Sequence, residues 1–505
     1  MGGEVILVGR SEDRKSGGPE VRWTSFRASG LGVAVVLAIV LAAAATLAAQ
    51  PAGWQRQVDK IFAEWDKKDS PGCAVALFKD GKILYERGYG MADLEHTVPI
   101  TPDTVFYAGS VSKQFTAFAA ALAIQQGLLA PDDSIRKYLP ELPSYADAIT
   151  VRHLVHHTSG LRDFYTLLSI AGRRQDALFD NASILRFAAR QKALNFPPGS
   201  DYLYSNTGYT LLAIVVSRAA KTTFGEYTDA HIFKPLGMSA SHFGDRADRL
   251  VRNRAYGYAW GSRGEPRLDT PGGERVGAGG LFTTVRDLLR WDENFYSGRV
   301  GGQALLDLVQ TPGALNGGKP LTYAWGLQIG SYRGLRIVEH AGGLGGYRAH
   351  LIRFPLQHVS VATLCNVSSI IPGSLARQAA DVVITQFREP RPAQPRPDAP
   401  GRGGQSAATP STVSAPAAGS LEDFAGTYAS DEIDATFRIS VRDGRLQLLR
   451  DDDNEPLPLQ AAGDGLFRTQ GMTIQFERGS SGRVDQLTVD AGRVRGIRFE
   501  RRKDP

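Results

Sequence analysis

Residues 106–126 read FYAGSVSKQFTAFAAALAIQQ and are followed by a glycine. Within this stretch Phe115, Phe118 and Leu122 repeat at i, i+3 and i+7, the spacing of one buried face of an α-helix. The pattern therefore predicts a helix that begins at about Ser110 and ends at the glycine, which cannot easily continue it.

Ser110 and Lys113 form a Ser-x-x-Lys motif at the start of this helix. Residues three apart lie one turn from each other, so the lysine ammonium is expected near the serine hydroxyl. A serine hydroxyl is a weak nucleophile until a neighbouring base takes its proton. A buried lysine near the positive end of a helix dipole has a lowered pKa and can act as that base. The same spacing also occurs by chance, with serine as a simple N-cap.

A second pattern is Tyr204-Ser205-Asn206, which follows the turn sequence FPPGS at residues 196–200. In an extended segment residues two apart point the same way, so Tyr204 and Asn206 are expected to face one cleft. A phenol can relay a proton and a carboxamide can orient a lysine or a substrate amide. The alternative is a packed tyrosine ring and an asparagine that closes a turn.

A third pattern is His340-Ala341-Gly342-Gly343, directly after a strand-like segment at residues 335–338. Glycines allow a substrate carbonyl to approach the edge of a strand closely. The alternative is a glycine-rich hairpin loop with an incidental histidine.

Taken in order, Ser-x-x-Lys, Tyr-x-Asn and His-x-Gly resemble the three signature elements of the penicillin-binding-protein and class C β-lactamase superfamily. Residues 106–109, 153–161 and 277–284 also resemble landmarks of that superfamily, and the likeness extends over residues 54–387. It implies an α+β fold in which an antiparallel sheet is flanked by helices and accompanied by a helical subdomain.

The resemblance also implies a role for each motif residue. Ser110 would form the acyl-enzyme, while Lys113 and Tyr204 would share the work of general base and general acid. The backbone N–H groups of Ser110 and Gly343 would form the oxyanion hole. The residues implied to orient or bind the substrate are Asn206, His340 and Gly342. No metal and no organic cofactor is implied.

The third motif departs from the β-lactamase pattern, because His340-Ala341 stands where those enzymes usually have Lys-Thr. Alanine offers no hydrogen bond and histidine is only partly charged at neutral pH. We therefore expect an esterase or a D-amino-acid peptidase, acting on a small ester, amide or peptide. One alternative is a β-lactamase or DD-peptidase that acts on β-lactams or cell-wall peptides. Another is a catalytically silent cell-wall-binding or sensor protein, which would not need all the motif residues.

The chain begins with a polar, basic region at residues 1–30 and an apolar segment at residues 31–50. A basic flank, an apolar run and small residues at its end are typical of a signal peptide. Because residues 31–49 also suffice to cross a bilayer, an uncleaved membrane anchor is the rival interpretation. We expect an exported protein, periplasmic or extracellular.

Composition divides the rest of the chain into three parts. A hydrolase domain is expected at residues 54–389, a Pro/Ala/Gly-rich linker at 390–418 and a small β-barrel at 419–505. The last part resembles lipocalin-like domains appended to some of these hydrolases, and we expect it to flank the active-site cleft or to act in assembly. A net charge of +6 without a long basic run makes nucleic acid a poor candidate partner.

Only two cysteines occur, Cys73 and Cys365, so the sequence contains neither a disulfide framework nor a cysteine-rich zinc site. The family resemblance places their strands side by side in one sheet. Buried thiols that simply pack are the more common outcome for such a pair, and we expect that outcome here in preference to a disulfide.

Overall fold

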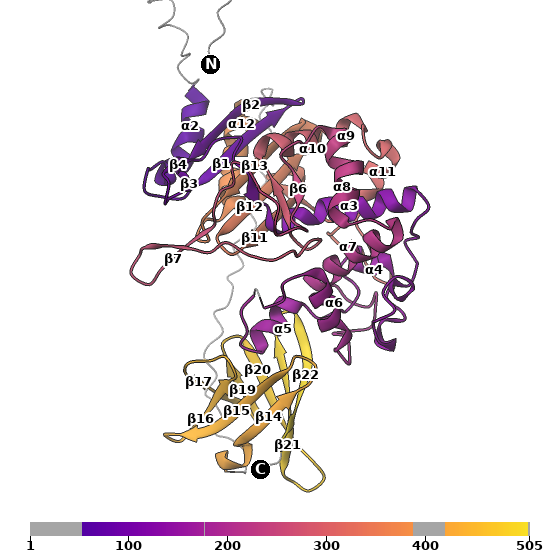
Figure 1. Ribbon diagram of the computed structural model, residues 1–505, viewed down its shortest axis with the longest axis vertical. Helices are drawn as coiled ribbons and strands as arrows, with labels where there is room; N and C mark the ends of the chain where they lie inside the picture. The colour runs from indigo at the N-terminus through magenta and orange to yellow at the C-terminus, as the bar shows by residue number, and fades with distance from the viewer. Residues whose placement is uncertain (1–52, 176, 387–419, 503–505) are drawn as a thin grey trace, which may run out of the picture. The chain divides into compact units, whose positions relative to one another are not determined.

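The computed structural model describes residues 53–175, 177–386 and 420–502 (Figure 1). The predicted targeting segment, the basic region before it and the linker at residues 390–418 lie outside the described residues. In the part of the chain that is described, no helix is both long and apolar enough to cross a membrane.

Six antiparallel strands form the central sheet, in the order β10-β11-β12-β13-β1-β2. They are β1 (Cys73–Lys79), β2 (Lys82–Tyr89), β10 (Gln328–Tyr332), β11 (Leu335–Leu344), β12 (Tyr347–Phe354) and β13 (Val359–Cys365). Strand β1 thus pairs with β13, nearly 300 residues later in the sequence, and β2 adds to the edge beyond β1. The predicted α+β fold, with an antiparallel sheet flanked by helices, is confirmed.

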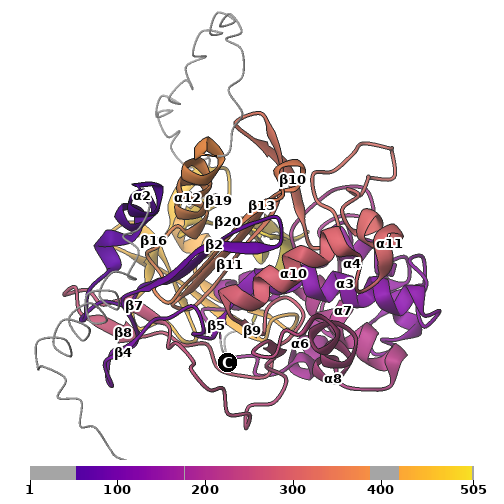
Figure 2. The same ribbon diagram turned by 90° about the horizontal axis from the view of Figure 1, so that it is seen from above.

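Both faces of this sheet are covered, because its central strands are apolar on both sides. Alternate residues of β1 belong to different cores: Val75 lies in one with α2 (Gly53–Phe62) and α12 (Pro372–Gln386), whereas Ala76 lies in another with most of the helices between β2 and β10. Figure 2 shows α2 and α12 together on one side of the strands. Alternation of this kind is what the two-residue period of a strand requires.

The helices between β2 and β10 form the other layer. They are α3 (Ser112–Gln125), α4 (Val151–Val155), α5 (Phe164–Ile170), α6 (Asn181–Ala189), α7 (Asn206–Ala220), α8 (Phe224–Thr228), α9 (Lys234–Leu236), α10 (Val285–Ser297) and α11 (Gly302–Val309). The sequence pattern predicts that α3 buries one face, but all residues from Ser112 to Ala123 are buried. Its run of alanines explains the difference, because small side chains let α7 and α11 pack closely around it.

Short strands complete the first domain: β3 (Met91–Asp93), β4 (Val98–Pro99), β5 (Phe106–Tyr107), β6 (His242–Phe243), β7 (Tyr258–Trp260), β8 (Pro266–Leu268) and β9 (Leu281–Thr283). Of these, β5, β9 and β6 form one small sheet in which Tyr107 pairs with Phe282. This pairing brings the glycine-rich stretch before β9 beside the segment that leads into Ser110.

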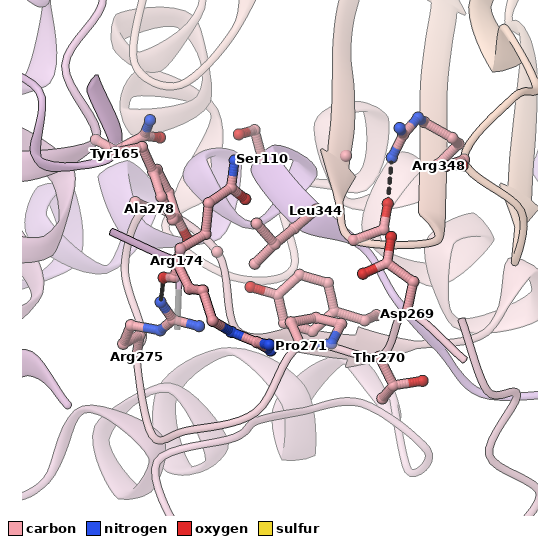
Figure 3. Close-up of a pocket in the computed structure, with 18 of the residues that line it drawn as sticks. Ser110, Tyr165, Arg174, Asp269, Thr270, Pro271, Arg275, Ala278, Leu344 and Arg348 are labelled. Carbon is pink, nitrogen blue, oxygen red and sulfur yellow. Dashed lines mark hydrogen bonds between the residues drawn. The ribbon is translucent and has the colours of Figure 1, made fainter. Parts of the chain in front are cut away.

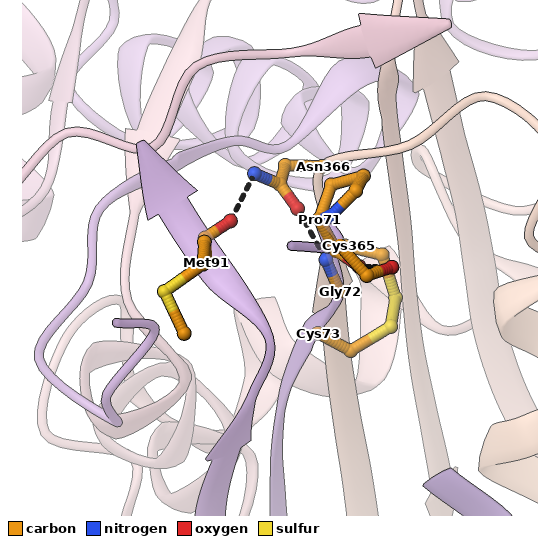
Figure 4. The surroundings of a disulfide bond; sticks show 7 residues. Pro71, Gly72, Cys73, Met91, Cys365 and Asn366 are labelled. Carbon is orange, nitrogen blue, oxygen red and sulfur yellow. Dashed lines mark hydrogen bonds between the residues drawn. A yellow bond between two sulfur atoms is a disulfide. The ribbon is translucent and has the colours of Figure 1, made fainter. Parts of the chain in front are cut away.

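Cys73 and Cys365 form a disulfide, so the expectation of two separate thiols is wrong. The sequence does not fix the register of β1 and β13, and the structure places the two residues directly opposite each other, with Cα atoms 4.0 Å apart. Next to the bridge, the Asn366 side chain accepts a hydrogen bond from Gly72 N and donates one to Met91 O (Figure 4). The ends of both strands are therefore fixed together.

We expect the disulfide to be measurable in the purified protein. Alkylation under denaturing conditions without reductant should leave both cysteines unmodified, and alkylation after reduction should modify both. The double variant Cys73→Ala/Cys365→Ala should lose about 2–5 kcal/mol of unfolding free energy in urea titrations, because the bridge restricts a long loop of the unfolded chain. Two alkylated cysteines in the unreduced protein would contradict the pairing.

The C-terminal residues form a nine-stranded antiparallel sheet, the β-domain, in the order β17-β16-β15-β14-β22-β21-β20-β19-β18. Its strands are β14 (Gly426–Ser430), β15 (Ala435–Arg442), β16 (Arg445–Arg450), β17 (Leu457–Pro458), β18 (Gln460–Gly463), β19 (Leu466–Thr469), β20 (Met472–Arg478), β21 (Val484–Ala491) and β22 (Val494–Arg501). Alternate residues of β15 and β22 are buried, as in a curved sheet that encloses a core. This all-β domain is nearly closed and agrees with the predicted lipocalin-like barrel.

The β-domain shares its core with α5 and α6 of the first domain. Phe164, Leu168 and Phe187 pack in the same hydrophobic cluster as residues of β15, β20 and β22. A buried ion pair at 2.7 Å joins Arg162 to Glu432, and the two side chains are only 2% and 5% exposed. This contact links the segment before α5 to the β-domain, and breaking it would leave an uncompensated buried charge.

Candidate active site

Ser110 lies in a single 3₁₀ turn, η2 (Gly109–Val111), immediately before α3. The turn begins at Gly109, whose φ of +52° favours glycine. The other motif serine, Ser112, is fully buried, donates a hydrogen bond to Gly109 O and accepts one from Leu281 N. Ser112 is thus committed to structure, whereas Ser110 lines a cavity.

Lys113 is fully buried, and its Nζ contacts three acceptors. These are Ser110 Oγ at 3.0 Å, Asn206 Oδ1 at 2.9 Å and Ala278 O at 2.7 Å. Burial lowers the pKa of Lys113 well below its usual range; the charge of Asp163 opposes this effect and that of Arg493 adds to it. When the ammonium loses one proton, two N–H groups remain for the two carbonyl oxygens and the lone pair is left for the serine hydroxyl.

The Tyr204 ring lies 4.7 Å from Lys113 Nζ. Burial raises the pKa of the phenol, although a hydrogen bond with Ser110 acts in the opposite direction. Tyr204 is therefore a neutral phenol at neutral pH, able to donate a proton or to relay one.

Asn206 does not continue an extended segment, as the sequence pattern predicts, but is the first residue of α7. Ser205 caps that helix by accepting a hydrogen bond from Gly208 N, which fixes the change of direction. Tyr204 and Asn206 nevertheless line the same cavity. The prediction that the two face one cleft is right, but the extended geometry on which it rests is wrong.

Asp163, which the sequence analysis did not single out, holds Asn206 in place. Its fully buried carboxylate accepts hydrogen bonds from Asn206 N at 2.7 Å and from Asn206 Nδ2 at 2.8 Å. With its amide group committed to Asp163, the carboxamide must turn its oxygen toward Lys113. An aspartate before a helix is a recognisable N-cap signal, but nothing in the sequence connects it with a residue 43 positions later.

Gly342 and Gly343 lie on an unpaired edge of β11. Strand β10 pairs with β11 only from Leu335 to Glu339, so the following residues have no strand partner on that side. They face the Ser110 turn instead: a Cβ on Gly342 would overlap Ala108 O and lie 2.9 Å from Ser110 N. Only glycine permits this approach, and a Cβ on Gly109 would likewise lie 2.4 Å from Gly343 N. Ser110 and Gly343 both line the cavity.

His340 is buried and its ring is tied on both sides. Nε2 lies 2.9 Å from Tyr323 Oη and Nδ1 lies 2.6 Å from Ala341 O. Burial, assisted by the charge of Lys113, lowers the pKa of His340 to about 3. The imidazole is therefore neutral at neutral pH and supplies no positive charge to a substrate.

The main cavity at Ser110 has a volume of about 760 Å³. Its lining includes Asp269 and four arginines, namely Arg174, Arg275, Arg348 and Arg493. In Figure 3, Arg275 and Arg348 lie on opposite sides of the cavity, and each donates to a backbone carbonyl. A second hollow, of about 390 Å³, contains His340, Gly342 and Gly343 and also reaches Ser110.

In the part of the chain that the structure describes, Asp93, Glu95 and His96 form a group whose ligand atoms lie within 4.8 Å of one another, close enough to hold a metal ion. They lie around the turn between β3 and β4, His96 already bonds Asp93 at 2.8 Å, and none of the three lines the Ser110 cavity. They have no evident part in chemistry at Ser110.

A serine, its buried lysine, a neutral tyrosine and a glycine-lined strand edge around one cavity define a serine hydrolase that works through an acyl-enzyme. Comparison with known families agrees, since the family model Beta-lactamase matches residues 58–384. The chain belongs to the Beta-lactamase family, and the predicted membership of the penicillin-binding-protein and class C β-lactamase superfamily is confirmed.

Individual relatives are distant. The chain is 28% identical to penicillin-binding protein 4* of Bacillus subtilis (strain 168) over 315 residues. This alignment covers 59% of this chain and 69% of that protein. It is also 27% identical to the D-aminopeptidase of Gluconobacter oxydans (strain 621H) over 324 residues. That alignment covers 64% of this chain but only 61% of the relative, so the chain matches less than two thirds of that protein's length.

Some solved structures resemble most of the chain, and one of them also carries a penicillin-binding-protein name. It is the octameric penicillin-binding protein homologue from Pyrococcus abyssi, which is 22% identical, has a TM-score of 0.58 and covers 88% of this chain and 98% of its own. At this identity the likeness concerns the fold alone.

Proposed function

We propose that the protein hydrolyses a small ester, or an amide of the D-amino-acid type, through an acyl group on Ser110. The contact that supports this most directly is that of Lys113 Nζ with Ser110 Oγ at 3.0 Å, in a site where burial favours the neutral amine. A binding or sensor protein would need neither a deprotonated lysine nor the residues that orient it.

In the proposed acylation, Ser110 Oγ attacks the substrate carbonyl carbon and its proton passes to Lys113 Nζ. The N–H groups of Ser110 and Gly343 stabilise the negative charge on the carbonyl oxygen. The bond to the leaving group then breaks, and the leaving group takes a proton that Tyr204 relays from Lys113. Water attacks the acyl-serine in the second half-reaction, with the same groups restoring the starting protonation.

Lys113 suits the role of base better than Tyr204 does, because burial shifts the two pKa values in opposite directions. It lowers the pKa of Lys113 and raises that of Tyr204. The lysine thus becomes easier to deprotonate, while the phenol keeps its proton and serves as the donor.

The substrate class follows from the neutral His340 and from Ala341, which together offer neither a fixed charge nor a hydroxyl to a substrate carboxylate. Of the arginines that line the cavity, Arg275 and Arg348 donate to backbone carbonyls and Arg493 pairs with Asp163. The relatives include proteins named D-aminopeptidase, which supports an amide of a D-amino acid.

Export is also part of the proposal. Disulfides persist in oxidising compartments, so the Cys73–Cys365 bridge supports the interpretation of residues 31–50 as a signal peptide or anchor. We further propose residues 54–389 as the catalytic domain and 419–505 as the domain that docks beside it.

A short-chain aryl ester or a D-amino-acid amide should be cleaved with a higher kcat/KM than a chromogenic cephalosporin. The cephalosporin carboxylate would lack the charge-assisted hydrogen bonds that Lys and Thr give it in β-lactamases. Each such bond is worth about 1.5–3 kcal/mol, which corresponds to a roughly tenfold to hundredfold lower rate for each missing bond. The measurement uses one enzyme preparation and one pH for all substrates.

The variant His340→Lys/Ala341→Thr should narrow the gap by improving cephalosporin cleavage, and the neutral ester serves as the control for damage to the site. If the unmodified enzyme prefers the cephalosporin by a wide margin, the protein is a β-lactamase and the proposed substrate class is wrong.

A further inference from the structure

The hairpin of β21 and β22 carries an arginine of the β-domain to the Ser110 cavity. Ala491 pairs with Val494, so only Gly492 and Arg493 form the turn, and Gly492 has a φ of +44°. Arg493 at this tip lines the same cavity as Ser110, Tyr204 and Asn206, although it lies 383 positions after the nucleophile in the sequence.

The hairpin is held in place by hydrogen bonds to the backbone of Arg493, Arg495 and Gly496. Asn195 donates from Nδ2 to Arg493 O at 3.0 Å and accepts from Arg495 N at 2.8 Å. Arg162 donates to Arg495 O and Gly496 O at 3.0 and 2.8 Å, while it also pairs with buried Glu432. The position of the Arg493 side chain is therefore determined by the docked domain.

The Arg493 guanidinium is connected to Lys113 through two intermediate side chains. Its Nη2 lies 3.0 Å from Asp163 Oδ1, and the Asp163 side chain is 0% exposed. Oδ2 of the same carboxylate accepts both hydrogen bonds from Asn206, whose Oδ1 contacts Lys113 Nζ at 2.9 Å. Arg493 also lies over the Tyr204 ring, 5.4 Å from its centroid.

We propose that Arg493 is a positioning residue of the active site, through which the docked β-domain holds Asp163 and Asn206 in the arrangement that keeps Lys113 a base. The inference rests on the proposed function, because it assigns Arg493 a part in the same proton transfer. The β-domain then completes the catalytic site instead of merely lying beside it.

The physical basis is the cost of a buried carboxylate. Without a cation beside it, the fully buried Asp163 carboxylate would lose its ion-pair partner, and Lys113 would remain as a positive group with which it interacts. The attraction would favour the protonated lysine: Asp163 raises the pKa of Lys113, whereas Arg493 lowers it. The other titratable groups near Lys113 are Tyr204, Tyr209, His157 and His340. Burial keeps all four neutral at neutral pH.

Arg493→Gln should move the acidic limb of the pH–rate profile to higher pH. Lys113 must be unprotonated to accept the serine proton, so the rate rises with pH through the Lys113 pKa. Removal of a neighbouring charge typically shifts a pKa by roughly one unit or more. At pH values below the Lys113 pKa the rate should therefore be about tenfold lower than in the wild type, and at pH values above it the rate should change little. The readout is the rate at which a fluorophosphonate labels Ser110, measured from about pH 5 to about pH 10, because a lysine pKa lowered from its ordinary value falls in that range.

Three variants separate positioning from a general loss of structure. Arg493→Lys keeps the charge and should restore most of the shift. Asp163→Asn removes the negative charge and should move the limb in the opposite direction, to lower pH. Arg495→Gln is the matched control, because among the described residues that side chain forms an ion pair with exposed Asp201 at 3.7 Å, away from Asp163, and it should leave the limb unchanged. Melting temperatures of all variants report folding.

The outcomes distinguish this inference from the proposed function. A wild-type protein that is not labelled at Ser110 contradicts the proposed function itself. A wild-type protein that is labelled, together with a folded Arg493→Gln variant whose limb coincides with that of the wild type, overturns the role of Arg493 alone. An upward shift in Arg493→Gln that Arg493→Lys reverses supports it.

Discussion

Replacement of Ser110 by alanine should lower kcat/KM for the best substrate by at least ~10³-fold while the protein stays folded, as loss of a covalent nucleophile does in comparable enzymes. In the structure no neighbouring group takes over the attack. The other serine of the motif, Ser112, is fully buried, and its hydroxyl is engaged by Gly109 O and Leu281 N. A fluorophosphonate should accordingly label Ser110 in the wild type, and peptide mass mapping should find no label there in Ser110→Ala.

Ser112→Ala is the matched control, since it removes a hydroxyl two positions away. It leaves the buried Leu281 N–H without its acceptor, which costs about 1–3 kcal/mol of stability. The variant should therefore melt at a lower temperature but still become labelled at Ser110. If Ser110→Ala retains most of its activity, or if the label is found on Ser112, the assignment of the nucleophile is wrong.

The features that the sequence predicts correctly depend on local geometry. One helical turn separates Ser110 from Lys113 whatever the rest of the fold does, and the structure places Lys113 Nζ 3.0 Å from Ser110 Oγ. The strand-like segment at residues 335–338 is the first part of β11, because its apolar pattern needs only the two-residue period of a strand. The α+β fold of the whole domain then follows from the superfamily that these elements resemble.

The features that the sequence does not predict depend on contacts between distant segments. Asp163 meets Asn206 from 43 positions away, and Arg493 meets Asp163 from another domain, 330 positions away. The Cys73–Cys365 bridge depends on a strand register that neither strand specifies by itself. A local pattern also fails at Asn206, where the capping of α7 by Ser205 overrides the extended course predicted from the preceding turn.

Lys113→Arg should be nearly as damaging as Lys113→Ala, and each should lower kcat/KM by roughly 10²–10⁴-fold, the range for loss of a general base. The arginine keeps a positive charge but does not deprotonate in the working pH range. It therefore separates the two roles that a lysine beside a nucleophile can have. As a base, Lys113 must become neutral, and burial lowers its pKa accordingly; as a fixed cation, it would only need to stay charged.

The same comparison has a pH signature. With wild-type Lys113 the rate of Ser110 labelling should rise with pH through the lowered lysine pKa and then level, whereas Lys113→Arg should show no such limb below the alkaline range. Lys113→Ala checks that the loss of activity in Lys113→Arg does not come from the larger size of the guanidinium. Alanine is smaller than lysine and fits the site, although it leaves Asn206 Oδ1 and Ala278 O without their hydrogen-bond donor. An arginine variant with near wild-type kcat/KM would mean that Lys113 acts through its positive charge. The serine proton would then have to pass to Tyr204, although burial raises the pKa of that phenol and so favours its protonated form.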